Sequence, residues 1–240
     1  KIYLDDDLFA KRTKQIAQPK VDFVIEYLNG VKNIDTPKWV DIGSGGGEVL
    51  KACTLAGCEA IGVESDPNET EFSRSKGLTV LNEMFNEHNA DAILADADIV
   101  SVFNVLEHMH DPIGFFRSLT IVEGDRLYVF EVPRHPSISS FLNQCFPNQA
   151  CRHIYPPDHL HIFTNESIDI MLNECGLESR AIWYFGQDFN EMVTSCASES
   201  KFKSKFLPQI LSMSNQIQAV IDENELGDAI LIIAGRKKSV

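Results

Sequence analysis

The sequence predicts a doubly wound α/β fold built on a seven-stranded, mainly parallel sheet. Apolar runs and helical patterns alternate between residues 38 and 132, as parallel strands joined by right-handed helical crossovers require. The first run leads into a turn that carries four glycines between Gly43 and Gly47. With 240 residues, 44% of them hydrophobic, the chain is long enough for one α/β domain with insertions.

The elements of this sheet follow from the apolar runs and the helix-capping residues between them. Asp66-Pro67 and Asp111-Pro112 each place an N-cap before a proline at the first helical position, and Thr164 caps a later helix. The polar piece 82–96 stays unassigned. We expect strands at 38–42, 59–63, 78–81, 98–103, 126–132, 177–185 and 228–234, with helices at 47–56, 67–76, 111–121 and 165–175.

We expect residues 1–240 to form a single domain. Three of its segments lie outside the alternation of strands and helices. Residues 1–37 contain a helical pattern from Gln15 to Leu28, and they are expected to form an N-terminal helical lid. The proline-interrupted stretch 134–160 is expected to be a long functional loop. Residues 186–227 have helical periodicity and form an insertion between the core (38–185) and the last strand and tail (228–240).

The glycine-rich turn indicates a nucleotide-like ligand, because a strand, a tight turn and a helix bring the main chain close to what binds there. A dinucleotide fingerprint needs a third glycine where this chain has Glu48, and a carboxylate there repels a pyrophosphate. Asp41 precedes the turn at the end of the strand, a position from which its carboxylate can contact a cationic ligand. Both residues favour a cationic ligand without phosphates.

Two more motifs agree with this interpretation. The second strand ends in Glu64, an acidic residue about 20 positions on, as expected of a residue that binds ribose hydroxyls. The strand 98–103 is followed by Asn104-Val105-Leu106-Glu107-His108 and then by Asp111-Pro112. From about residue 38 to 183 the chain resembles class I S-adenosylmethionine-dependent methyltransferases, in the branch that includes ubiquinone-biosynthesis and sugar or other small-molecule enzymes.

The resemblance implies a Rossmann-like methyltransferase fold and S-adenosylmethionine as the cofactor. It places Glu64 on the ribose and Asn104 along the pocket, and it assigns the N-terminal helical segment, with Tyr3, Phe9 and Arg12, to a cover over the cofactor. The adenine contact stays open, because the family often places an acidic residue at the end of the third strand, where this chain has Asn82-Glu83-Met84-Phe85. The methionine end is assigned to the turn, at Asp41, Gly43, Ser44, Gly45 and Gly47.

Methyl transfer needs alignment and exclusion of water first, and only some acceptors need a base. The base candidates are His108, His159 and His161, with Glu107 and His110 beside them. A neutral imidazole within hydrogen-bond reach of an acceptor hydroxyl accelerates transfer by about 10²–10⁴-fold. The alternative for each histidine alone is a structural role, as a partner of a loop carbonyl.

Residues 151–161 contain several side chains that can bind a metal ion. A His-x-His pair with a carboxylate can hold a divalent ion. Prolines interrupt the stretch, and the resemblance accounts for His159 or His161 without a metal, so none is expected. The candidate ligands are Cys151, His153, Asp158, His159 and His161.

Charge and cysteine usage limit the partners and the compartment. Thirty-five acidic against 21 basic residues give a formal charge of −14, which repels nucleic acids and anionic membranes. The basic cluster Lys201, Lys203 and Lys205 is expected to be a solvated face. Six scattered cysteines, with no C-x-x-C and no signal-peptide pattern at the first residues, indicate a cytoplasmic protein.

We therefore expect an S-adenosylmethionine-dependent methyltransferase that acts on a small-molecule acceptor, a sugar or another polar metabolite. The insertion 186–227 either covers the acceptor pocket or forms the surface of a homodimer. Two alternatives remain, a nicotinamide-dependent oxidoreductase and a non-catalytic module that binds the same cofactor. Glu64 suits both nucleotide cofactors, so Asp41 and Glu48 are the residues that distinguish them.

Overall fold

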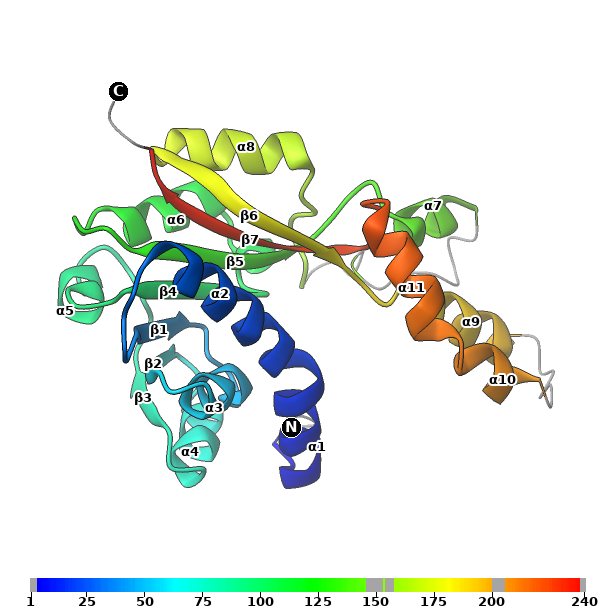
Figure 1. Ribbon diagram of the computed structural model, residues 1–240, viewed down its shortest axis with the longest axis horizontal. Helices are drawn as coiled ribbons and strands as arrows, with labels where there is room; N and C mark the ends of the chain where they lie inside the picture. The colour runs from blue at the N-terminus through cyan, green and yellow to red at the C-terminus, as the bar shows by residue number, and fades with distance from the viewer. Residues whose placement is uncertain (1–3, 146–152, 154–157, 200–205, 238–240) are drawn as a thin grey trace.

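The computed structural model describes residues 4–145, 153, 158–199 and 206–237 (Figure 1). Seven strands form one sheet in the order β3-β2-β1-β4-β5-β7-β6, with β7 antiparallel to both of its neighbours. The predicted sheet is thus confirmed. The strands are β1 (Lys38–Ile42), β2 (Glu59–Glu64), β3 (Thr79–Asn82), β4 (Ile99–Phe103), β5 (Leu127–Pro133), β6 (Leu177–Phe185) and β7 (Ala229–Arg236).

The strand order reverses between β1 and β4, which pair in parallel with Trp39 opposite Ile99. From β1 the chain first builds outward through β2 and β3, then returns to β4 and builds the other way. A crevice therefore opens at the carboxyl ends of β1 and β4, where ligands of such sheets bind. This point of reversal positions the site described below.

Helices cover both faces of the sheet, each over its own apolar core. On one face α2 (Gln18–Val31) and α3 (Glu48–Leu55) pack against a cluster centred on the buried Trp39. On the other face α5 (Ala90–Leu94), α6 (Pro112–Thr120) and α8 (Asn165–Glu174) cover a second cluster, while α4 (Pro67–Ser75) packs on β2 and β3.

The predicted helix starts are confirmed by their hydrogen bonds. The side chain of Asp66 accepts from Asn68 N at 2.7 Å, and that of Asp111 accepts from Gly114 N at 2.8 Å. Thr164 makes a capping box with Ser167 at the start of α8. These caps fix α4, α6 and α8 directly after the loops that line the crevice.

The N-terminal segment is one continuous helical rod that crosses the crevice. It consists of α1 (Asp6–Arg12), a π-helical turn, η1 (Thr13–Ala17), and α2. Phe9 is buried and packs edge-on against Phe72 of α4, with ring centroids 5.8 Å apart. Residues 1–14 showed no helical period by sequence, so α1 was missed, and Tyr3 lies outside the described residues.

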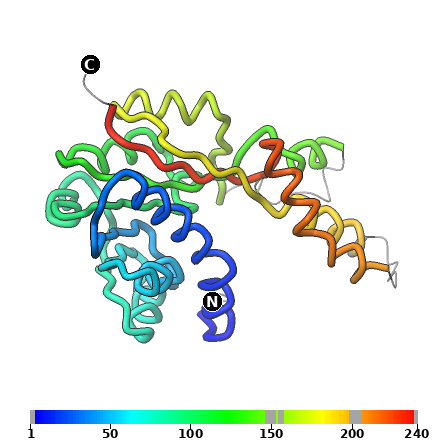
Figure 2. Tube along the Cα trace, viewed as in Figure 1, coloured from blue at the N-terminus to red at the C-terminus, as the bar shows by residue number. Residues whose placement is uncertain are grey.

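The insertion before the last strand is helical, as predicted. Its helices are α9 (Asp188–Glu199), α10 (Leu207–Leu211) and α11 (Ser214–Glu223), which lie together beyond the ends of β6 and β7 (Figure 2). The stretch 134–160 was expected to be a loop, yet it contains α7 (Ile138–Cys145), which packs on α9. Lys201, Lys203 and Lys205 lie outside the described residues.

In the part of the chain that the structure describes, no helix combines the length and the apolarity that a membrane span needs.

Candidate functional site

A cavity of about 640 Å³ opens at the carboxyl ends of β1, β2 and β4, beneath the N-terminal rod. Most of the predicted cofactor residues line it. They are Asp41, Gly43, Ser44, Gly45, Glu64 and Asn104. We call it the cofactor cavity.

The glycine-rich turn forms one wall of the cofactor cavity. Gly43 has a φ of +75°, and its amide donates to Val63 O at 2.8 Å. A Cβ on Gly43 would stand 2.5 Å from Val105 Cγ2, so glycine is needed for both reasons. Gly47 also has a positive φ, but it precedes α3 and faces Leu78 rather than the cavity.

Asp41 lies at the floor of the cofactor cavity and is only 2% exposed. Ser101 Oγ donates to Asp41 Oδ1 at 2.5 Å and accepts from Trp39 Nε1 at 2.7 Å. Burial raises the pKa of the Asp41 carboxyl to about 7, against the opposing hydrogen bond from Ser101. A cation bound in the cavity would stabilise the ionised carboxylate and lower this pKa.

Glu64 ties together the two loops that flank the cavity. One carboxylate oxygen accepts from Gly45 N at 2.9 Å and the other from Asp66 N at 2.8 Å. Asn82, considered for the adenine contact, instead donates to Glu64 O at 2.9 Å and does not line the cavity. Glu64 is thus fixed in place by backbone amides on both sides of the crevice.

The donor and acceptor groups of this cavity fit a cationic nucleoside. The carboxylates of Asp41 and Glu64 face it, and Ser44 Oγ is buried with no hydrogen-bond partner among the described residues. Glu48 also lines the cavity, where it forms an ion pair with Arg12 at 3.2 Å. Three carboxylates around one cavity disfavour a pyrophosphate, as the sequence indicated.

A second cavity, of about 460 Å³, adjoins the first along the N-terminal rod. The two share four lining residues, Arg12, Ile16, Lys20 and Asn104. Asn104 adopts a φ of +54°, unusual for a residue other than glycine, and its amide donates to Glu131 O at 3.2 Å. The strained end of β4 therefore presents the Asn104 side chain to both cavities. We call the second one the acceptor cavity.

The acceptor cavity combines an aromatic wall with many polar groups. Trp183 and Phe185 come from the end of β6, with ring centroids 4.8 Å apart. Asp222 of α11 lines the opposite part, and burial raises its pKa to about 6. Charged and polar groups also come from Arg12, Lys20, Glu131 and His153, and carboxamides from Gln15, Asn104, Gln187, Asn215 and Gln218.

A buried ion pair stands where the cavities meet. Lys20 of α2 pairs with Glu131 at the end of β5, and both side chains are 7% exposed. The Lys20 ammonium also lies over the rings of Phe103 and Phe185, 5.7 and 5.5 Å from their centroids. The pair holds the N-terminal rod on the sheet at the junction of the cavities.

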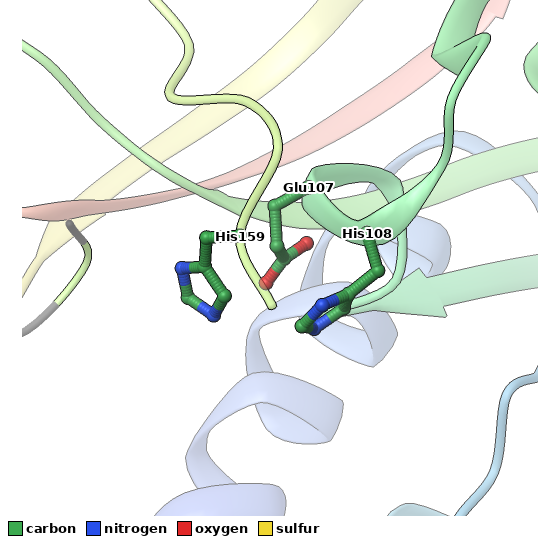
Figure 3. Close-up of side chains that lie close together, drawn as sticks. All are labelled: Glu107, His108 and His159. Atoms are coloured by element: carbon green, nitrogen blue, oxygen red, sulfur yellow. The ribbon is translucent and has the colours of Figure 1, made fainter. Parts of the chain in front are cut away.

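Two of the predicted histidines lie together next to Glu107 (Figure 3). His108 lines the cofactor cavity, and its ring centroid is 4.9 Å from that of His159. His108 Nδ1 donates to Asp158 O at 2.7 Å, and His159 Nδ1 donates to His153 O at 3.1 Å. Each ring is therefore held in the tautomer that leaves Nε2 as an acceptor.

Burial governs the charges in this group. It raises the pKa of Glu107 to about 7, and Glu107 Oε2 has no hydrogen-bond partner among the described residues. The pKa of His159 is lowered, chiefly by burial and then by the neighbouring His108. His161 lies apart, with its ring 6.3 Å from that of Phe163, and like His159 and His110 it lines neither cavity.

The described residues bring possible metal ligands together at one place. The nitrogen and oxygen ligand atoms of Glu107, His108 and His159 lie within 4.8 Å of one another. This is a different set from the stretch 151–161 weighed by sequence, in which Cys151 lies outside the described residues. Of that stretch only His159 belongs to the group.

Among the cavity-lining residues that sequence reasoning missed are Lys20, Glu69 and Trp183. Lys20 carried a usable signal, because a lysine on the sheet-facing side of an amphipathic helix needs a buried partner. Glu69 and Trp183 carried none, because each reaches its cavity through contacts between elements far apart in the sequence.

Residues 9–182 match the methyltransferase domain family. The chain belongs to that family. Curated relatives named ubiquinone biosynthesis O-methyltransferase align with it at low identity. The protein from Methylococcus capsulatus is 27% identical over 123 residues, 49% of this chain and 52% of that protein. The one from Aliivibrio fischeri is 23% identical over 180 residues, 72% and 76% of the two chains.

Solved methyltransferases share the fold. A SAM dependent methyltransferase from Archaeoglobus fulgidus superposes with a TM-score of 0.58 at 20% identity, covering 95% of this chain and 98% of its own. Magnesium protoporphyrin IX methyltransferase from Synechocystis, determined with bound SAH, gives 0.62 at 13% identity, covering 98% and 91%. The predicted class I methyltransferase family, fold, enzyme class and cofactor are confirmed.

Proposed function

We propose that this methyltransferase transfers the methyl group of S-adenosylmethionine from the cofactor cavity to a small polar acceptor in the acceptor cavity. The observation that carries the proposal is the adjoining pair of cavities, which share Arg12, Ile16, Lys20 and Asn104 at the point where the strand order reverses. When bound, the cofactor supplies a methyl group on an activated sulfonium leaving group. The protein has to hold, align and enclose the two reactants.

The cofactor is assigned to residues around the glycine-rich turn. Asp41, Gly43, Ser44 and Gly45 would hold the methionine end, with Gly47 shaping the turn from behind. Glu64 would accept from the ribose, and Asn104 would line the passage to the acceptor. Support comes from the lining of the cofactor cavity, which includes each of these residues except Gly47.

The lining of the acceptor cavity supports a small polar metabolite such as a sugar. The carboxamides of Gln15, Asn104, Gln187 and Asn215 offer donors and acceptors for hydroxyl groups, while Trp183 and Phe185 offer a flat apolar wall to a ring. About 460 Å³ suits a ligand of one or two rings. The insertion 186–227 supplies several of these side chains, so we assign it to acceptor binding ahead of a homodimer surface.

His108 is the best placed of the three predicted base residues, since it alone lines a cavity. Its Nε2 is the acceptor nitrogen, fixed by the Nδ1 bond to Asp158 O. His159 would then orient His108 through their edge-to-face contact. Nothing in its surroundings gives His161 a comparable role. Activity lost in His108→Ala but kept in His161→Ala would support this order.

Calorimetry tests the cofactor assignment before any acceptor is known. We expect S-adenosylhomocysteine to bind and NADH not to bind, with affinity weakened by about 1.5–3 kcal/mol in Asp41→Ala and in Glu64→Ala. NADH binding alone would instead favour the oxidoreductase alternative. Unchanged affinity in both variants would remove the site assignment.

Turnover distinguishes an enzyme from a module that only binds the cofactor. The assay is transfer of a tritiated methyl group from S-adenosylmethionine to a panel of neutral sugars, amino sugars, phenols and small amines. We expect product from at least one polar class, and none with Asp41→Ala. Tight cofactor binding without transfer to any of these classes would support the non-catalytic alternative.

A further inference from the structure

The cofactor cavity contains a fourth carboxylate that no motif predicts. Glu69 of α4 lines the cavity one helical turn after the N-cap Asp66. Its Oε2 atom stands 3.4 Å from where a Cβ on Gly45 would lie. Gly45 N is also the donor to Glu64 Oε2, at 2.9 Å. Glu64 and Glu69 therefore converge on the same point of the glycine-rich turn.

The two carboxylates differ in how their oxygens are used. Both oxygens of Glu64 already accept from backbone amides, those of Gly45 and Asp66. Glu69 is only partly buried, and burial raises its pKa, followed by the charges of Glu64, Asp66 and Glu48. Hydroxyl donors placed between Glu64 and Glu69 would lower the energy of both charges.

A ribose supplies such donors, because its 2′- and 3′-hydroxyls are adjacent and each can donate one hydrogen bond. Each oxygen of Glu64 already accepts one backbone amide and keeps one further acceptor site, and Glu69 adds acceptor oxygens at the same point of the turn. We propose that Glu69 is a further cofactor-binding residue, and that Glu64 and Glu69 together form a two-carboxylate ribose site. The inference rests on the proposed cofactor site, and it adds a ligand residue to that site.

Ligands that lack one hydroxyl test this directly. The measurement is calorimetric affinity for S-adenosylhomocysteine and for its 2′-deoxy and 3′-deoxy analogues, with wild type, Glu69→Gln and Glu71→Gln. Glu71 is an exposed carboxylate on the same helix, so Glu71→Gln is the matched control. Thermal unfolding of each variant checks that α4 remains folded.

We expect Glu69→Gln to weaken S-adenosylhomocysteine binding by about 10-fold or more, the loss typical of a hydrogen bond to a charged group. One of the two deoxy analogues should bind wild type about 10-fold more weakly, and Glu69→Gln should weaken that analogue no further. Glu71→Gln should bind all three ligands as wild type does.

Three outcomes overturn the inference. Glu69→Gln that binds every ligand like wild type removes Glu69 from the site. Equal weakening of all three ligands by Glu69→Gln assigns the residue to another part of the cofactor or to the shape of the turn. Wild type that binds none of the ligands overturns the proposed cofactor site itself, which separates that failure from the other two.

Discussion

The two cavities differ in how far apart in the sequence their lining residues lie. Apart from the N-terminal rod and Glu69 of α4, the cofactor cavity is formed by residues at or just after the ends of β1, β2 and β4, most of them within a short motif. The acceptor cavity takes its walls from α2, the end of β6 and α11, which are separated by up to two hundred positions in the chain. The first is a property of local turns, and the second exists only after the sheet and the insertion have packed.

This difference explains why one cavity has a defined ligand chemistry and the other does not. Positive φ at Gly43 and a capped helix start are local requirements that few residue types can meet. A wall such as Trp183 with Phe185 only needs bulk and an apolar surface, which many residue types supply. The aromatic wall can therefore be substituted without changing the glycine-rich turn.

The largest effect is expected at the turn. Gly43→Ala adds a Cβ 2.5 Å from Val105 Cγ2 at a positive φ, and should lower the free energy of unfolding by about 2–4 kcal/mol and abolish measurable cofactor binding. Gly57→Ala is the matched control, because Gly57 has a φ of +85° with open space around it. Its cost should be about 1 kcal/mol by urea unfolding. An equal loss of stability in Gly43→Ala and Gly57→Ala would show that the contact of the new Cβ with Val105 is relieved.

The next effect belongs to the acceptor cavity. Trp183→Ala removes one aromatic wall and should raise the KM of the acceptor by about 10–100-fold, near 1.5–3 kcal/mol, while affinity for S-adenosylhomocysteine stays within about twofold. Trp183→Phe should recover most of the loss. If cofactor affinity falls together with acceptor KM, the two cavities are not separable in the way described.

A smaller effect is expected where α11 meets α9. Gln218 Nε2 donates to Asp188 Oδ2 at 3.0 Å and to Asp222 Oδ1 at 2.8 Å. Gln218→Leu leaves two carboxylates without this donor and should cost about 1–2 kcal/mol of stability, measured by urea unfolding. Acceptor turnover should fall with it, whereas calorimetric cofactor affinity should not. Gln216→Leu, at an exposed position of the same helix, is the control.

The smallest effect is a pH-dependent one at Glu107. Because its pKa is raised to about 7, the folded state favours the protonated acid, and stability is lost as pH rises from about 4.5 through 7. Glu107→Gln copies the neutral acid, so it should be about 1 kcal/mol more stable than wild type at pH 8 and equal to it at pH 4.5. Urea unfolding at the two values checks this. If Glu107→Gln gained the same stability at both pH values, the predicted pH dependence through Glu107 would be wrong.

Much of the fold could be predicted, because its signals are local. Asp66, Asp111 and Thr164 cap helices as expected, and the apolar runs became strands close to the expected positions along the chain. The helix α1 was missed because it is short and mostly polar, so its sequence shows no amphipathic period. It is held in place by the packing of Phe9 on Phe72 of α4. The helix α7 was missed because three prolines nearby suggested a loop.

The site could be predicted only where it follows a motif. Asp41, Glu64 and Asn104 line the cofactor cavity at the strand ends to which they were assigned. The position of Lys20 on its helix signals a buried partner, but no motif identifies that partner as Glu131, which is 111 positions away. Such a pair is defined by how α2 crosses the sheet, and no short stretch of sequence contains it.

The lining residues that the two cavities share have a consequence for how ligands reach them. Arg12, Ile16 and Lys20 all lie on the N-terminal rod. The rod therefore lines both the cofactor cavity and the acceptor cavity. A displacement of this segment that widened the cofactor cavity would therefore widen the acceptor cavity as well. One continuous helical segment would thereby control access to both cavities.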